Sequence, residues 1–411
     1  MDTFFRRVWR WHFWAGLLSA PVVVVVAVTG AIYAFKDEIE DATDADLRFV
    51  PPAEVRAPLS RQVSAATARG EPATQVTLSA DPRRSTVVLV STPSGPRAMY
   101  VNPYTAEVVG EGPPRNEFFA VVLAVHRRLF ADTFGRILVE LATCWAVVLV
   151  VSGVYLWVPK AWRAVKGVWV PRVRAKPYVV LRDLHTLSGF YLGPVLVLLA
   201  VTGLFFSIVW MWSVNTVTGG AGEFPRHFLA GPPSAEGVIA PAALDAAERD
   251  ARREHPANTL VVMLPTARTE PVVVRVRGLS GPSYVASVAV DRTTGEVLSR
   301  KAFDPDLTWY EKLRMWVLPV HQGSAYGWPT KALAAACCLG LAWLAVSGVW
   351  MWLVRRPAGR SGFPRASAAP VPKAAVVVIL LLAVFFPVVG LSLVAVLVGE
   401  WLFCRISVSV R

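Results

Sequence analysis

Residues 12–30 read HFWAGLLSAPVVVVVAVTG, and residues 185–203 read HTLSGFYLGPVLVLLAVTG. The two stretches align without a gap at a constant spacing of 173 residues, which matches the leading histidine, the first glycine, the proline and the final Thr-Gly. Each is apolar and close to the length of about 20 residues that a membrane-crossing helix needs. The pair therefore predicts two equivalent membrane helices in two similar halves of the chain.

A second pair of similar stretches supports the repeat. His126 precedes an apolar run that ends in VSGVYLW, and His321 precedes one that ends in VSGVWMW. At a spacing of 195 residues the histidines, the Ser-Gly pairs and the last tryptophans coincide. Each half thus begins and ends with a membrane helix that has a histidine near one end.

The polar segment inside each half has the pattern of a small α+β domain. Helices are expected near 59–69 and 242–254, and strands near 75–79, 86–91, 260–264 and 272–276. Each segment closes with a hairpin pattern, AMYVNPYTAEVV in the first and ASVAVDRTTGEVL in the second. Gly295 supplies a turn glycine in the second hairpin, whereas Ala106 stands in the corresponding place in the first.

The composition agrees with a membrane protein that has large polar parts. Of the 411 residues, 54% are hydrophobic, and the mean hydropathy is positive. Five runs are long and apolar enough to cross a bilayer. They are residues 13–35, 137–158, 187–212, 332–354 and 374–398.

The distribution of charge predicts the orientation. The net charge is +13, and its Lys and Arg residues cluster beside the apolar runs, as cytoplasmic anchors do, so we expect membrane lipid and no nucleic acid as a partner. The basic loops at 159–183 and 355–373 and the N-terminus are expected in the cytoplasm. The chain is then a multi-pass membrane protein with residues 37–116 and 213–310 outside, which is the periplasm in a Gram-negative bacterium and corresponds to location in the bacterial inner membrane.

The predicted fold class is mixed: a polytopic α-helical membrane bundle with two α+β outer domains, internally duplicated. The expected boundaries are 1–36 for the first span, 37–116 for the first outer domain, 117–158 for the second span with a preceding amphipathic segment, 159–183 for a cytoplasmic loop, 184–212 for the third span, 213–310 for the second outer domain, 311–354 for the fourth span with a preceding segment, 355–373 for a cytoplasmic loop, 374–398 for the fifth span and 399–411 for a C-terminal tail.

Four of the six histidines fall on repeat positions, and this is the strongest functional signal. His12 and His185 lie at the cytoplasmic ends of two equivalent helices, and His126 and His321 lie on the opposite side. A twofold axis along the membrane normal would bring each pair together. Two facing imidazoles suit the iron of a haem, which takes axial ligands from both faces of its ring.

Other residues near these histidines are candidates for cofactor contacts. Gly16 and Gly189 would let a flat ring approach the backbone, and Arg10, Arg127 and Arg128 are candidates for binding propionates. No C-x-x-C-H motif is present, so two noncovalent haems of the b type are expected. Two histidines alone do not complete a zinc site. For a single histidine the simpler interpretation is an amphipathic residue at the membrane interface.

These motifs together resemble the PepSY-associated transmembrane family, iron-regulated bacterial inner-membrane proteins that include ferric-siderophore reductases. The resemblance rests on RRVWRWHFWAG, LHTLSG, AVHRRLF, the two V-S-G-V-x-x-W motifs and the hairpin VDRTTGEVL. It implies that His12, His126, His185 and His321 bind haem iron and that outer domains of the PepSY type flank a site where an iron chelate is reduced. The second copy of AVHRRLF departs from the pattern and reads PVHQGSAYG.

The expected function is therefore an enzyme, a haem-dependent oxidoreductase that passes electrons across the membrane to a ferric siderophore or another ferric chelate. The chain has no G-x-G-x-x-G context or P-loop, so the electrons need a separate cytoplasmic or quinol donor. Three alternatives stay open. They are a non-catalytic PepSY membrane protein that modulates a protease or sensor, a quinone-linked electron carrier, and a transporter, although the spans lack the buried charges of an ion path.

Overall fold

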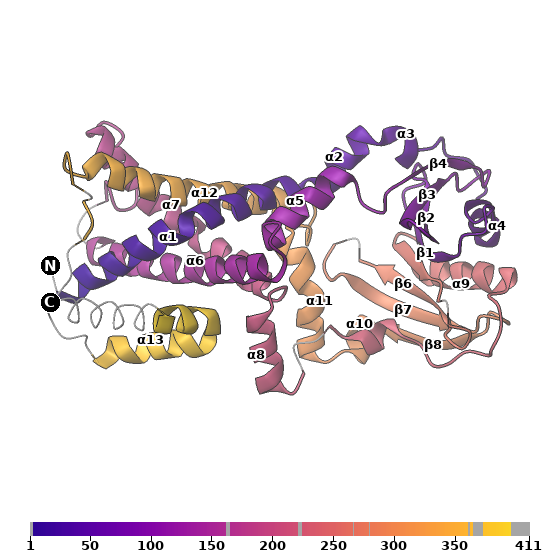
Figure 1. Ribbon diagram of the computed structural model, residues 1–411. Helices are drawn as coiled ribbons and strands as arrows, with labels where there is room; N and C mark the ends of the chain where they lie inside the picture. Colours follow the sequence, from indigo (N-terminus) through magenta and orange to yellow (C-terminus); the bar gives the residue numbers. More distant parts are fainter. Residues whose placement is uncertain are drawn as a thin grey trace.

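A bundle of long helices forms one end of the molecule, and a β-sheet with two helices forms the other (Figure 1). The computed structural model describes residues 3–161, 165–220, 224–265, 267–278, 280–360, 362–364 and 373–395.

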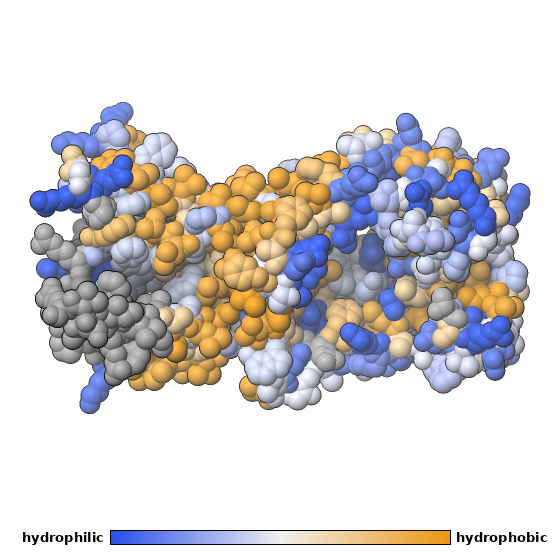
Figure 2. Space-filling view, viewed as in Figure 1, coloured by the Kyte–Doolittle hydropathy of each residue, from blue (hydrophilic) through white to orange (hydrophobic). Residues whose placement is uncertain are grey.

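Four helices of the described chain are long and apolar enough to cross a membrane. They are α1 (Thr3–Ala34), α6 (Asp132–Ala161), α7 (Pro177–Leu204) and α12 (Trp328–Arg355). A helix of 28 residues is about 42 Å long, which exceeds the hydrocarbon core of a bilayer. The middle of the bundle is covered by apolar side chains, whereas the outer end is largely polar (Figure 2). The chain is therefore a multi-pass membrane protein.

The four helices pack so that α1 and α7 each contact both α6 and α12. Helices α1 and α7 carry His12 and His185, so the two equivalent helices are placed across the bundle from each other. Pro21 and Pro194 lie inside them without ending them, as membrane helices allow when neighbouring helices satisfy the freed carbonyls.

The third span is shorter than predicted. We expected it to continue to residue 212, but α7 ends at Leu204 and a separate helix, α8 (Val209–Thr218), follows. The carboxylate of Glu140, on α6, accepts hydrogen bonds from the backbone N–H groups of Ile208, Val209 and Trp210 at 3.0, 2.9 and 2.7 Å. A buried carboxylate at the start of a helix satisfies its free N–H groups. Glu140 therefore stabilises the break that ends the span.

The C-terminal apolar region is described only in part. Helix α13 (Lys373–Phe385) has 13 residues and is about 20 Å long, too short to cross a bilayer by itself. A further helical stretch covers 387–395, and Phe386 packs in a cluster with Leu204 and Trp210. The expected fifth span, 374–398, and the tail, 399–411, extend beyond the described residues, so both stay predictions.

Two amphipathic helices connect the bundle to the outer end. Helix α5 (Glu117–Arg128) precedes α6, and α11 (Trp309–His321) precedes α12. The Asn116 side chain caps α5, and Thr308 forms a capping box with Glu311 at the start of α11. His126 lies in the last turn of α5, and His321 is the last residue of α11. The caps therefore fix the starts of the two helices that carry the outer histidines.

The outer end contains one antiparallel sheet of eight strands in the order β4-β3-β2-β1-β5-β6-β7-β8. Its strands are β1 (Ala73–Leu78), β2 (Thr86–Thr92), β3 (Gly95–Val101), β4 (Val108–Gly112), β5 (Thr259–Met263), β6 (Val272–Arg277), β7 (Tyr284–Val290) and β8 (Val297–Ala302). The remaining short helices are α2 (Lys36–Thr43), α3 (Ala45–Arg48), α10 (Phe303–Asp306) and a 3₁₀ turn, η1 (Arg226–Leu229).

The two outer segments share this sheet instead of forming separate domains. Strand β1 pairs with β5, with Val76 opposite Val262 and Leu78 opposite Leu260. Helices α4 (Leu59–Ala66) and α9 (Pro241–Glu254) pack against one continuous apolar core with these strands. The carboxylate of Asp245, on α9, accepts hydrogen bonds from the backbone N–H and the Oγ of Ser60, on α4, each at 2.8 Å. The two outer segments are therefore joined by the pairing of β1 with β5 and by the contact between α4 and α9.

The hairpin turns differ as the sequence indicated. Gly295 has φ of 79°, and Ala106 adopts φ of 60° at the corresponding turn. An L-residue pays a steric cost of about 1 kcal/mol in this left-handed region, and glycine does not. The first hairpin is therefore the more strained of the two.

Candidate functional site: two pairs of histidines

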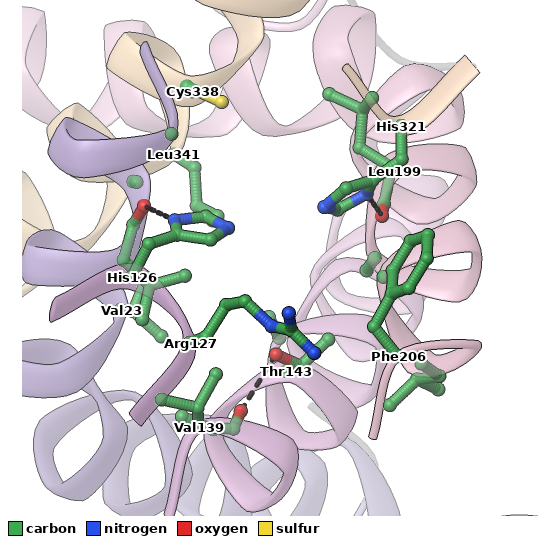
Figure 3. A pocket seen from close by; sticks show the side chains of 18 of the residues that line it. Val23, His126, Arg127, Val139, Thr143, Leu199, Phe206, His321, Cys338 and Leu341 are labelled. Carbon is green, nitrogen blue, oxygen red and sulfur yellow. Dashed lines mark hydrogen bonds between the residues drawn. The ribbon is translucent and has the colours of Figure 1, made fainter. Parts of the chain in front are cut away.

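His126 and His321 face each other across a cavity near the outer end of the bundle (Figure 3). Their ring centroids are 6.3 Å apart, and the ring planes are inclined by 52°. In Figure 3 the Nε2 side of each ring points into the space between them. The structure therefore brings together the outer pair that the repeat predicted.

The other ring nitrogen of each outer histidine is bound to the protein. His126 Nδ1 lies 2.9 Å from the carbonyl oxygen of Val26, and His321 Nδ1 lies 2.9 Å from that of Leu199. A carbonyl oxygen only accepts hydrogen bonds, so each Nδ1 carries the proton and each Nε2 keeps a free lone pair. Burial also lowers the pKa of His321 to about 4, which keeps this ring neutral at neutral pH.

The inner histidines are held in the same way by a different group. His12 Nδ1 lies 2.8 Å from the Oγ of Ser152, and His185 Nδ1 lies 2.8 Å from the Oγ of Ser347. Both serines belong to the V-S-G motifs of α6 and α12. The Oγ atoms also lie within reach of backbone carbonyls three residues earlier, at 3.2 and 3.3 Å, which can accept the hydroxyl protons. Each Oγ is then free to accept Nδ1–H, which again leaves Nε2 unprotonated.

Glycine residues give the two outer rings their space. An added Cβ would lie 3.1 Å from His126 Cε1 at Gly30 and 2.9 Å from His321 Cε1 at Gly203. At Gly153 and Gly348 it would lie 3.4 and 3.5 Å from the Cε1 atoms of His12 and His185, which is ordinary van der Waals contact. The Thr-Gly and Ser-Gly pairs therefore support the histidine rings, a role that the repeat alone did not reveal.

The glycines that we expected to contact a flat cofactor have other neighbours. A Cβ at Gly16 would meet Leu149 at 3.7 Å, and one at Gly189 would meet Leu344 at 3.6 Å. No histidine atom is within 4 Å of either position. Their contact with a cofactor stays a prediction.

The arginines divide between the cavity and the surface. Arg127 lines the cavity and extends into it, as Figure 3 shows. Arg128 does not line it and forms a long ion pair with Asp132 at 3.4 Å instead. Arg10 lies two residues before His12, and its Nε is buried without a hydrogen-bond partner. The prediction missed Arg115 and Arg136, which also line the cavity, because they are ten or more residues from the histidine in sequence.

The distance between His126 and His321 fits a haem whose iron is bound by two histidines. A metal ion bound by both Nε2 atoms needs two bonds of about 2 Å. Adding the distance from each Nε2 to the centroid of its own ring gives an expected distance of about 6 Å between the two ring centroids. The observed separation is 6.3 Å. The cavity has a volume of about 400 Å³ and mostly apolar walls, as small-molecule sites do. No group of three or more His, Cys, Asp or Glu ligands occurs among the described residues.

The two remaining histidines lie apart from this site. His227 is exposed and lies 3.4 Å from the carboxylate of Glu311, and His255 follows the end of α9 on the outer domain.

The chain matches the family model described as the PepSY-associated TM region over residues 9–355. This chain belongs to that family. The matched region of the PepSY-associated TM family contains all four paired histidines and both Ser-Gly supports. A comparison with curated proteins found no match. Membership establishes a membrane protein of the PepSY-associated type.

Proposed function

We propose that this protein is a membrane reductase that holds two b-type haems and passes electrons from the cytoplasmic side to a ferric chelate, such as a siderophore, on the periplasmic side. One observation carries the proposal: four histidines form two sets, one toward each end of the bundle, and each has Nδ1 bound to the protein and Nε2 free. A structural histidine at a membrane interface needs no such arrangement. Haem bound between the rings would supply reversible one-electron transfer.

The residues around the histidines would prepare each site for a metal ligand. The carbonyls of Val26 and Leu199 and the hydroxyls of Ser152 and Ser347 orient the rings and increase the electron donation of Nε2. The apolar walls of α1, α6, α7 and α12 exclude water, so hydrogen bonds and charges act more strongly there.

The arrangement along the chain suits transport of electrons across the bilayer. His12 lies 14 residues before Val26, which contacts the outer His126. Along one helix this corresponds to about 21 Å, most of the hydrocarbon core. We propose that the two halves are repeats related by an axis along the membrane normal, with the N-terminus in the cytoplasm of a bacterial inner membrane. A cytoplasmic or quinol donor would supply one electron for each ferric ion reduced.

The outer sheet would bring the substrate to the periplasmic side. Of the parts of the chain that the structure describes, the PepSY-type segments are the ones large enough to bind a bulky chelate. They are attached to the bundle through α5 and α11, the helices that carry His126 and His321. One electron delivered there reduces Fe(III) to Fe(II), which prefers different ligands and so leaves the chelate.

The proposal is tested on the full chain, purified after expression with added haem precursor. We expect two noncovalent haems with a reducible b-type spectrum. His12→Ala or His185→Ala should remove one haem, and His126→Ala or His321→Ala the other. The matched control is His227→Ala, at the exposed histidine, which should leave both haems in place. A colourless protein would overturn the proposal.

The reaction itself is tested by mixing dithionite-reduced protein with ferric citrate or a hydroxamate siderophore. We expect the haems to reoxidise while a colorimetric chelator captures ferrous iron. His126→Ala should stop iron reduction and leave the inner haem reducible. Reoxidation by quinone, with no ferric chelate active, would identify a quinone-linked electron carrier instead.

A further inference from the structure

Three arginines line the cavity between His126 and His321. The cationic lining residues are Arg115, at the start of the segment leading into α5, Arg127 on α5, and Arg136 on α6. All three belong to the first half of the chain. The electrostatic neighbours of Arg127 include Arg115, Arg128 and Arg136, which repel it. Such a cluster in a low-dielectric cavity is unfavourable without an anion.

The protein supplies little to balance these charges. Neither Arg115 nor Arg127 forms a hydrogen bond or an ion pair through its guanidinium group within the described part of the chain. Arg136 reaches only the carbonyl oxygen of Phe206, at a long 3.5 Å. The acidic residue lining the cavity is Glu140, whose two oxygens already accept three backbone N–H groups at the start of α8.

The second half does not repeat the cluster. At the spacing of 195 residues that relates His126 to His321, the counterparts of Arg115, Arg127 and Arg136 are Tyr310, Gln322 and Lys331. Gln322 lines the cavity but is neutral. Lys331 does not line it and forms ion pairs with Glu38 at 2.8 Å and Asp37 at 3.8 Å. The ligands are therefore paired between the halves, whereas the cavity cations come from one half.

We propose that Arg115, Arg127 and Arg136 form a dicarboxylate site that binds both propionates of the outer haem and fixes the edge of the haem that faces this cluster. The inference rests on the proposed function, because it assumes haem between the outer histidines. A haem carries both carboxylates on one edge, so the cation cluster selects one orientation of a ring that the two histidines alone would leave free to turn. Guanidinium–carboxylate hydrogen bonds are charge-assisted and directional.

Two measurable effects follow from this arrangement. The loss of one arginine removes a charge-assisted hydrogen bond to a propionate, so it should speed loss of the outer haem about tenfold or more. Cations near the iron also favour the reduced form, which carries one positive charge less. The reduction potential of the outer haem should therefore fall when an arginine is neutralised.

The experiment uses the full chain with His12→Ala, which leaves only the outer haem, so each measurement reports one site. Arg127→Gln and Arg136→Gln are compared with Lys331→Gln, which removes the same charge outside the cavity. Loss of haem is measured by transfer to excess apomyoglobin, and the potential by spectroelectrochemical titration. We expect faster loss and a lower potential for the two arginine variants and unchanged values for Lys331→Gln.

A charge-swapped variant guards against simple misfolding. Arg127→Gln combined with Gln322→Arg keeps the net charge of the cavity but moves the cation away from Arg115 and Arg136, so it should not restore haem retention. Arg127→Lys should lie between the wild type and Arg127→Gln. If Arg127→Gln and Arg136→Gln retain haem as well as Lys331→Gln does, the inference fails while the proposed function stands. If the wild type holds no haem, both fail.

Discussion

The Oγ of Ser347 lies 2.8 Å from the Nδ1 of His185, and the equivalent serine of the first half, Ser152, lies at the same distance from His12. Two motifs about 150 residues from their histidines thus place a hydroxyl oxygen against each Nδ1, where it favours the tautomer with the proton on Nδ1. The outer histidines reach the same state through backbone carbonyls.

Replacing Ser347 with alanine should loosen the inner haem. The change leaves His185 Nδ1–H without its Oγ acceptor, and loss of such a supporting bond typically weakens metal binding about 10- to 100-fold. We expect faster loss of the inner haem and a higher reduction potential, with the outer haem unaffected, measured by haem transfer and redox titration. Ser19→Ala is the control, because Ser19 Oγ bonds only its own helix, at the carbonyl of Ala15. Equal behaviour of the two variants would refute a role for Ser347.

Replacing Gly203 with alanine should disturb the outer haem. The new Cβ would lie 2.9 Å from His321 Cε1, so the ring or the helix must shift, at a cost of about 1–3 kcal/mol. We expect a shifted or weakened spectrum of the outer haem. The control, Gly189→Ala on the same helix, meets Leu344 at an ordinary 3.6 Å and should leave the outer spectrum unchanged. An unaltered outer spectrum in Gly203→Ala would contradict the geometry.

Two turn substitutions should act in opposite directions on the outer sheet. Ala106→Gly relieves a left-handed alanine and should stabilise the first hairpin by about 0.5–1 kcal/mol. Gly295→Ala introduces the same strain and places a Cβ 3.1 Å from atoms of Ala243 and Ala246, so it should destabilise the second. Limited proteolysis of the full chain measures both: cleavage of the outer domain should slow in the first variant and accelerate in the second. Acceleration in Ala106→Gly would argue against the strain.

The orientation of the chain can be tested with reporter fusions. The loop that follows α6 and the segment after α12 are rich in Lys and Arg, which anchors such loops in the cytoplasm. Fusions after Arg174 and Arg360 should therefore report cytoplasm, and fusions after Pro93 and Pro282 should report periplasm. The inverse result would place the PepSY-type segments in the cytoplasm, away from a ferric chelate arriving from outside.

The sequence predicted the elements better than their contacts. Runs of valine and leucine determined four membrane helices, and alternation predicted most strands, because these signals are local. The sequence predicted that His126 and His321 face each other, because both halves carry these histidines at constant spacing. The third span was predicted too long because Glu140, the residue that stabilises its end, lies on another helix.

The residues that contact the histidine rings are repeated in the sequence, but the sequence does not show that they contact those rings. Thr202-Gly203 and Ser347-Gly348 stood out as repeated residues, yet nothing local indicates that a glycine on one helix faces a histidine on another. Arg136 was missed for the same reason, since it reaches the cavity from α6 and not from the histidine's own helix. Contacts between distant segments are set by packing, which one sequence does not reveal.

The β1–β5 junction has a consequence for the association of this molecule with other chains. An antiparallel contact between equivalent edge strands is the self-complementary kind that two identical subunits form about a twofold axis. A single half, made alone, would leave the β1 edge bare, and an unpaired edge recruits another strand. The pairing of β1 with β5 within one chain thus covers both edges, and neither is left to recruit a strand from another molecule.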